Sequence, residues 1–377
     1  MRLSRKARWA VPGVAVIATA GAIAASAIGV AQAAPGLPAK TPAQLLTAIG
    51  STQSVPPLTG TVVETTSLGL PKLPDAGNQG SLASLITGSH TIKVYWKDAT
   101  HFRLAVPQPM SETDVIRDGA TGWLWDSQGN TVTRFSAADK PAHPAPEKLP
   151  PLTPQQAASQ ALAAVGPTTV VSVDSNLTVA GEAAYQLVLA PKDSRSTIGS
   201  VRVAIDGKTN VPLRVQVFAR GASSPAFQVG YTQISYTAPA AANFSFTPPA
   251  GATYDDTTKP SAGHDTSKAG YGQYGQGWLA VAEVPQSVLA QAGPAPGATS
   301  APSGTATFSG DSAAAVSAFL GAAKPVHGAW GSGQLLHTSL VNVLIVGDEM
   351  YAGAVDPSVL YAAVGHATPA GNGAGDS

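Results

Sequence analysis

Residues 100–135 read THFRLAVPQPMSETDVIRDGATGWLWDSQGNTVTRF, and this stretch decides the fold. Apolar residues recur at every second position, as in Phe102-Arg103-Leu104, so each short segment has one apolar and one polar face. Asp118-Gly119 and Gly129-Asn130 are typical of tight hairpin turns between such segments. A long meander of this kind curls into a half-open barrel, whose inner face must be covered by side chains, a helix or a ligand.

The same pattern extends to both sides of this stretch. Along 225–237 the apolar phase changes, which predicts a β-bulge near Thr232. Two helices are predicted, one from a Thr41 cap to Gly50 and one from a Thr153 cap to Val165, because each cap precedes a proline at the first helical position. In total we expect about twelve strands, at 58–66, 90–97, 101–106, 112–118, 121–126, 130–135, 169–174, 183–190, 198–206, 211–219, 225–237 and 243–247.

The N-terminus predicts export. Four basic residues precede an apolar run from Trp9 to Val30, and Ala31-Gln32-Ala33 has the small-x-small pattern of a signal-peptidase site. We expect cleavage before Ala34, and an uncleaved membrane anchor is the alternative because the apolar run is long. The chain has no cysteine, which excludes disulfides, thiolate metal sites and a lipid-modified N-terminal cysteine.

Composition argues against several classes of function. Lys and Arg total 22 and Asp and Glu total 22, and the basic residues do not cluster outside the N-terminus, so no nucleic-acid partner is predicted. The seven histidines lack metal-ligand spacing, and neither a GxSxG nucleophile turn nor a P-loop is present. We therefore predict no enzyme activity, no metal and no cofactor. Ser, His and Asp can converge from any part of a fold, so an enzyme or a purely structural envelope protein stays an alternative.

Changes in composition divide the chain into five parts. Pro, Gly, Thr and Asp dominate after residue 252, which is typical of a linker. The predicted parts are a signal peptide or anchor at 1–33, an open-barrel domain at 40–252, a linker at 253–276, a small α+β domain at 277–366 and a disordered tail at 367–377.

The order of the predicted elements resembles the LolA lipoprotein-carrier family and its relatives, including the periplasmic sensor RseB. The similarity covers residues 40–252, and the small C-terminal region is similar to one that follows such domains in actinobacterial proteins. The segments that carry the resemblance are Leu58-Thr59-Gly60-Thr61-Val62, Asp118-Gly119 with Trp123-Leu124-Trp125-Asp126, Tyr185 to Pro191, Val201 to Asp206 with Pro212-Leu213-Arg214-Val215, and Phe244 to Pro249.

The resemblance implies an α+β fold in which a half-open antiparallel β-barrel of about 11–12 strands carries a helical lid or plug. It further implies a secreted or cell-envelope protein that binds or carries lipids or lipoproteins and holds their acyl chains in an apolar cavity. The alternative is an RseB-like envelope sensor that binds lipid or lipoprotein and signals to a membrane-bound regulator. A lipoprotein-processing protein is a further candidate partner.

The candidate lipid-binding residues are the large apolar side chains that should point to one face of the meander. On the alternative interpretation the same residues form a closed core against the two helices. They are Val94, Trp96, Phe102, Leu104, Trp123, Trp125, Leu187, Leu189, Val203 and Val215. Leu82, Leu85 and Ile86 lie on a loop after a Pro- and Gly-rich segment and are predicted to form a gating flap or to pack on the rim.

Overall fold

The computed structural model describes residues 36–51, 55–69, 87–136, 153–163, 165–256, 272–285 and 321–366. The predicted signal peptide or anchor at 1–33, the flap residues Leu82, Leu85 and Ile86, and the predicted tail at 367–377 lie outside these ranges. Within them, no helix has both the length and the apolar character that a bilayer-spanning segment needs.

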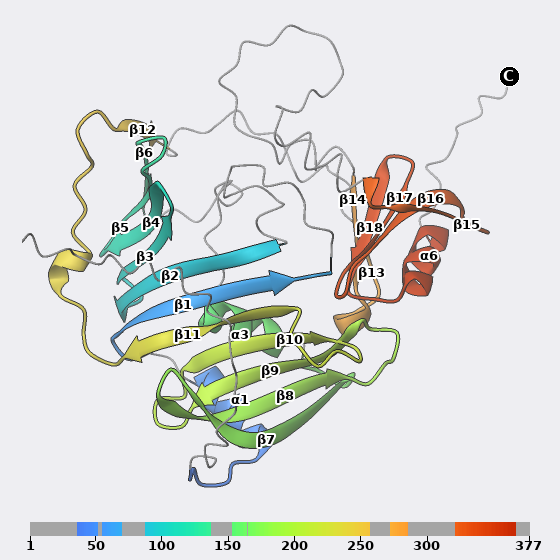
Figure 1. Cartoon of the computed structure of the whole chain (residues 1–377), viewed down its shortest axis with the longest axis horizontal. Helices are drawn as coiled ribbons and strands as arrows, with labels where there is room; N and C mark the ends of the chain where they lie inside the picture. The colour runs from blue at the N-terminus through green and yellow to red at the C-terminus, as the bar shows by residue number, and fades with distance from the viewer. Residues whose placement is uncertain are drawn as a thin grey trace, which may run out of the picture. The chain divides into compact units, whose positions relative to one another are not determined.

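The larger of two sheets has twelve strands in the order β12-β6-β5-β4-β3-β2-β1-β11-β10-β9-β8-β7 (Figure 1). Neighbouring strands are antiparallel, except that β12 runs parallel to β6. Their bounds are β1 Leu58–Ser67, β2 Thr87–Asp98, β3 His101–Gln108, β4 Ser111–Asp118, β5 Thr121–Asp126, β6 Thr131–Ser136, β7 Thr169–Val179, β8 Glu182–Pro191, β9 Ile198–Asp206, β10 Pro212–Ala219, β11 Phe227–Ser235 and β12 Thr253–Asp256.

The end strands β12 and β7 do not pair with each other, so the sheet is open. This confirms the predicted half-open β-barrel with helices and its number of strands. The strand predicted at 243–247 is wrong, because Ala241–Asn243 is a 3-10 helix and Phe244 follows it as its C-cap. The chain pairs again only at β12, in the segment that the sequence analysis assigns to the linker.

Both predicted helices of this part are confirmed, together with their caps. In α1 (Pro42–Ser51) the Thr41 hydroxyl accepts a hydrogen bond from the Gln44 N–H at 3.2 Å, and the Thr41 N–H donates to Gln44 Oε1 at 2.8 Å. In α3 (Pro154–Ala163) Thr153 and Gln156 form the same reciprocal pair, at 3.3 and 2.9 Å. Such capping boxes satisfy backbone donors that have no partner within the helix.

The predicted bulge is confirmed at Thr232. Thr61 pairs with Gln233 and Val62 pairs with Tyr231, so Thr232 is the extra residue on β11. Its hydroxyl donates to the carbonyl of Thr61 at 3.2 Å. The bulge shifts the phase of β11 so that Val229 and Tyr231 stay on the core side of the sheet.

The second, smaller sheet has six strands in the order β13-β14-β18-β17-β16-β15, and α6 contacts β14, β17 and β18. Val281, Leu344, Tyr351, Val355 and Leu360 are buried in its core. Its first strand begins inside the predicted linker. The bounds are β13 Gly272–Tyr274, β14 Val281–Pro285, β15 Lys324–Gly328, β16 Gly331–His337, β17 Asn342–Val346, β18 Glu349–Gly353 and α6 Pro357–His366.

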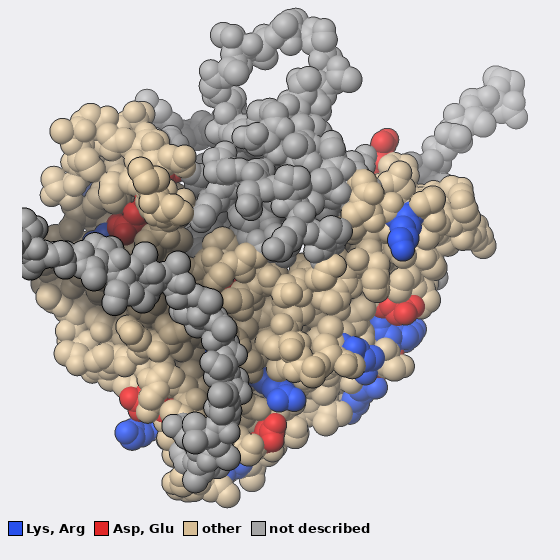
Figure 2. All heavy atoms as spheres, viewed as in Figure 1, with Lys and Arg blue, Asp and Glu red and all other residues tan. Residues whose placement is uncertain are grey.

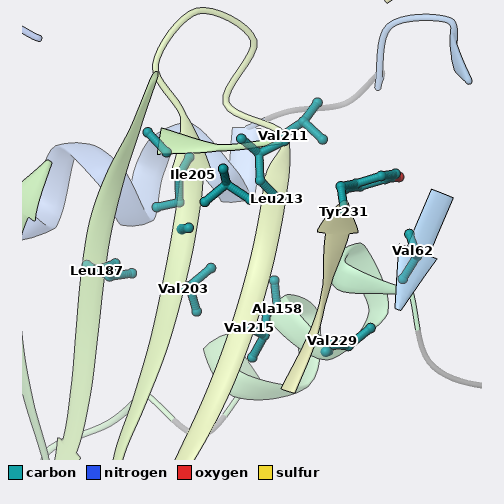
Figure 3. Packing of buried hydrophobic residues seen from close by; sticks show 14 of the residues in the cluster. Val62, Ala158, Leu187, Val203, Ile205, Val211, Leu213, Val215, Val229 and Tyr231 are labelled. Atoms are coloured by element: carbon teal, nitrogen blue, oxygen red, sulfur yellow. The ribbon is translucent and has the colours of Figure 1, made fainter. Parts of the chain in front are cut away.

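The main core lies between the larger sheet and its two helices. Leu45 of α1 and Ala158 of α3 are fully buried against side chains from the sheet. Alanines in α3 let its backbone approach β10 and β11 closely. Figure 3 shows Leu187, Val203 and Val215 on neighbouring strands, with Ala158 close to Val215.

Candidate functional site

The face of the larger sheet that meets α1 and α3 is called the inner face below, and the opposite one the outer face. Because side chains alternate along a strand, the register of each pairing assigns every residue to one face. Leu187 pairs with Val203 and Val203 with Val215, and all three are buried in the main core. They define the inner face on β8, β9 and β10.

Five of the ten predicted lipid-binding residues lie in the packed part of the inner face. Val94, Leu187, Leu189, Val203 and Val215 are all buried. All five belong to the main core, which also contains Leu45 of α1 and Ala158 of α3; α3 contacts β10 and β11, and α1 contacts β7. Their side chains therefore form core packing here, and a role in lining a lipid cavity stays a prediction.

Three more of the predicted residues continue the inner face beyond the helices. Trp96, Phe102 and Leu104 are half-buried, and Leu104 pairs with the buried Val94. The Trp96 and Phe102 rings stack at 5.6 Å, and the Trp96 indole N–H donates to the carbonyl of Val55 at 3.2 Å. These contacts fix the orientation of both rings while leaving them partly exposed.

The register adds Val115, Leu124 and Phe135, which the sequence analysis missed. Leu104 pairs with Val115 and Val115 pairs with Leu124, so Val115 and Leu124 lie on the inner face with Leu104. Phe135 pairs with Gly122 on the same face, and its ring occupies the space that a side chain at Gly122 would need. We call Phe102, Leu104, Val115, Leu124 and Phe135 the apolar patch; all five are half-buried.

The expectation that all ten residues share one face is wrong for Trp123 and Trp125. Trp123 pairs with Ile116, and Trp125 pairs with Asp114, which places both indoles on the outer face. Phe246 lies against both rings, at centroid distances of 5.9 and 6.0 Å. The two tryptophans therefore pack against the segment after β11 and do not extend the apolar patch.

A buried ion pair lies on the outer face next to Trp125. Arg103 Nη2 contacts Asp114 Oδ2 at 2.5 Å and Glu112 Oε1 at 3.1 Å. Asp114 is fully buried, and burial raises its pKa to about 6 against the lowering effect of Arg103. Asp114 Oδ1 and Trp125 Nε1 are buried and form no hydrogen bond.

This raised pKa predicts how stability depends on pH. Asp114 holds its proton more tightly in the folded chain, so the folded state binds more protons between pH 4 and 6 and its stability falls as the pH rises through that window. The Asp114→Asn variant lacks this titration. The quantity to follow is the difference in unfolding free energy between the wild type and the variant. We expect the stability advantage of the wild type over the variant to fall by about 3 kcal/mol at most between pH 4 and pH 7. Urea unfolding at several pH values measures it, and a difference that rises with pH would contradict it.

Charged groups do not single out another site. Among the described residues, no three His, Cys, Asp or Glu side chains lie close enough to hold a metal ion. In the view of Figure 2, Lys and Arg side chains are sparse and have Asp and Glu among them, and most of the described surface belongs to other residue types. The apolar patch is therefore the main candidate site.

One residue from the smaller sheet's part of the chain reaches the main core. Trp278, in the 3-10 helix Gly277–Leu279, is buried with the core residues of the larger sheet, and its indole N–H donates to Thr169 Oγ1 at 2.7 Å. Ser196 and Val355 also form an antiparallel β-bridge between the two parts. The two sheets are thus joined through side chains and backbone.

Comparisons with known proteins find similarities at the level of structure only. No family model and no curated protein matches the chain. A chain in the complex structure of Pseudomonas aeruginosa MucA/MucB is 14% identical, with 85% of this chain and 94% of that chain covered and a TM-score of 0.39. A LolA superfamily protein from Nitrosomonas europaea is 11% identical, with 55% and 99% covered and a TM-score of 0.23. A DUF1329 family protein from Desulfovibrio piger is 12% identical, with 54% and 95% covered and a TM-score of 0.24.

The similar structures include a LolA superfamily protein, the family that the sequence resembles. At these identities and TM-scores the likeness carries no argument about function. The function is argued from the residues of this chain.

Proposed function

We propose that this chain is an extracytoplasmic binding or carrier protein for lipids or lipoproteins, which holds acyl chains against the apolar patch. One observation supports the proposal. The apolar inner face continues from the buried Val94 through Leu104 to Leu124, onto strands β3 to β6. The helices α1 and α3 do not contact these strands closely. Each methylene that an acyl chain buries contributes about 0.8 kcal/mol.

The proposal requires no catalytic group. Shape and apolar surface suffice to bind an acyl chain, and no cofactor or metal takes part. The basic and apolar N-terminal sequence supports export from the cytoplasm, either as a cleaved signal peptide or as an uncleaved anchor. The protein would then meet lipids at the outer surface of a membrane.

The proposal is tested by native mass spectrometry of the full chain purified from a lipid-containing host. We expect a population whose added mass corresponds to one or two acyl lipids and which loses that mass on delipidation. A protein that stays free of lipid, both as purified and after incubation with diacyl lipid in micelles, would overturn the proposal.

Substitution within the apolar patch gives a sharper measurement. Leu124→Gln places a carboxamide where an acyl chain would lie, so we expect the affinity for a diacyl lipid to fall about tenfold or more. Val170→Gln is the matched control, because Val170 is 48% exposed on β7, away from the patch. Equal retention of lipid by both variants, in titrations at matched folded concentration, would show that acyl chains do not bind at the patch.

The alternative is an envelope sensor that binds lipid or lipoprotein and signals to a membrane-bound regulator. One observation favours it. Trp278, which comes from the smaller sheet's part of the chain, packs in the main core and donates a hydrogen bond to Thr169. A sensor predicts that diacyl lipid changes hydrogen exchange in β14 and β18, whereas a simple carrier predicts changes confined to the larger sheet.

A further inference from the structure

One arginine lies at the edge of the apolar patch. Phe102 pairs with Arg117, and Arg117 pairs with Gly122, so the Arg117 side chain shares the inner face with Phe102. Two residues back along β4, Val115 belongs to the patch itself. Arg117 is half-buried, as the patch residues are. A group that stays positively charged therefore adjoins the surface that the proposed function assigns to acyl chains.

Aromatic rings lie on both sides of Arg117. On the β3 side, the Phe102 ring stacks on the Trp96 ring. On the β5 side, the Phe135 ring lies where a side chain at Gly122 would be. Rings exclude water and lower the local dielectric constant, so a contact between opposite charges is stronger beside them than on an open surface.

The guanidinium of Arg117 has hydrogen-bond donors to spare. Its Nε donates to the carbonyl of Gly119 at 3.2 Å, and among the described residues the guanidinium forms no salt bridge. The described side-chain atoms that are buried without a partner include Nε of Arg103 but no atom of Arg117, so its spare donors are accessible. They can donate to two oxygens of a carboxylate or a phosphate, a geometry that suits a guanidinium.

Two carboxylates lie at the same end of the strands, and both contact a histidine. Asp98 Oδ1 is 3.0 Å from His101 Nδ1, and Asp118 Oδ1 is 3.5 Å from His101 Nε2. His101 precedes Phe102 on β3, so its side chain lies on the outer face. These carboxylates therefore do not pair with Arg117.

A third carboxylate lies on the inner face at the far end of the patch. On the inner face of β3 to β6, strands that the structure describes throughout, the one charged residue besides Arg117 is Asp126. Asp126 accepts the Gln128 N–H of its own turn at 2.9 Å. It pairs with Thr113, which is four residues and roughly 14 Å from Arg117 along β4. The two ends of the patch thus differ in charge, and an anion is favoured at the Arg117 end.

We propose that Arg117 binds the anionic headgroup of an acyl lipid whose chains lie on the apolar patch, so that the protein prefers lipids with a carboxylate or phosphate to uncharged ones. This inference rests on the proposed function, because it assigns the polar end of the same ligand. The headgroup lies at the Phe102 end of the patch, and the chains extend across Val115 and Leu124.

The test compares two lipids with identical chains on the full protein. Dioleoylphosphatidylglycerol and dioleoylglycerol are supplied at equal mole fraction in neutral-detergent micelles, and bound lipid is quantified by native mass spectrometry. We expect the phospholipid to be bound in about tenfold excess, because hydrogen bonds between charged groups are stronger than those to a neutral hydroxyl. In a parallel measurement, inorganic phosphate added to the lipid-free protein should give no adduct that depends on Arg117.

Three variants locate the effect. Arg117→Gln removes the charge and should reduce the excess about fivefold or more, while binding of dioleoylglycerol stays unchanged. Arg117→Lys keeps the charge and should retain most of the excess. Arg134→Gln is the matched control, because Arg134 is exposed on β6 and pairs with Trp123 on the outer face.

The other outcomes separate this inference from the proposed function. Equal binding of both lipids, or a preference for dioleoylglycerol, would overturn the headgroup site and leave acyl binding at the patch intact. The site would also be overturned if Arg117→Gln keeps the excess, or if Arg117→Lys loses as much of it as Arg117→Gln. A phosphate adduct that Arg117→Gln lacks would assign the site to a free anion instead. Failure to bind either lipid would overturn the proposed function itself.

Discussion

Replacing Leu187 by Ala is expected to lower the unfolding free energy by about 2–5 kcal/mol while leaving acyl-lipid binding per folded molecule unchanged. Leu187 is fully buried and pairs with Val173 on β7 and Val203 on β9. The truncation removes apolar contacts and leaves a cavity that the rigid sheet fills only in part. Urea unfolding and lipid titration on the same preparations measure the two quantities.

The control for this variant is Val170→Ala on the exposed side of β7, for which we expect a change below about 0.5 kcal/mol. If Leu187→Ala keeps its stability but loses affinity for lipid, the acyl chains bind between the sheet and the helices and not at the apolar patch. This result would support the role that the sequence analysis predicts for Leu187.

Replacing Arg103 by Met is expected to destabilise the fold by about 3–5 kcal/mol. The substitution leaves Asp114 buried without its cation, and desolvation of an unpaired charge is costly. Chemical unfolding at pH 7 measures the loss. It should be smaller at pH 4, because Asp114 is then protonated and needs no counter-charge.

Two further variants make this prediction specific. Arg195→Met breaks an exposed ion pair with Asp193, and its effect should lie within the scatter of the measurement. The double variant Arg103→Met/Asp114→Leu removes both charges and should recover most of the lost stability. If Arg103→Met is as stable as the wild type at pH 7, the pair is not needed to neutralise a buried charge.

Local sequence signals predicted the elements of the fold well. The Thr41 and Thr153 caps, each followed by Pro at the first helical position, located both helices to within two residues. The change of apolar phase located the bulge at Thr232. These features depend on residues close together in sequence, which is why they can be read without a structure.

The face of the sheet on which Trp123 and Trp125 lie can be predicted from the lengths of the hairpin loops. The β3–β4 hairpin closes through Pro109-Met110 and the β4–β5 hairpin through Gly119-Ala120, so both loops have two residues. Loop length fixes register, and counting outward from each loop pairs Leu104 with Val115 and Val115 with Leu124. The same count places both tryptophans on the outer face.

The division of the inner face into a packed and a half-exposed part was not readable from the sequence. A helix of 10 residues is about 15 Å long and spans only about three strands spaced about 4.8 Å apart. Which strands α3 covers depends on long-range contacts such as the 3.0 Å hydrogen bond from Gln155 Nε2 to the Tyr231 hydroxyl. No local pattern around Gln155 indicates that partner.

The two outermost strands of the open sheet have a consequence for self-association. At one end β12 adds a short parallel strand to β6, and at the other the pairing of β7 with β8 is interrupted between Asp174 and Leu177. Within the described residues, neither end strand therefore presents a long, regular row of unpaired backbone groups on which a second polypeptide could extend the sheet. The sheet can therefore leave the apolar patch half-exposed without offering its end strands, β12 and β7, for edge-to-edge polymerisation.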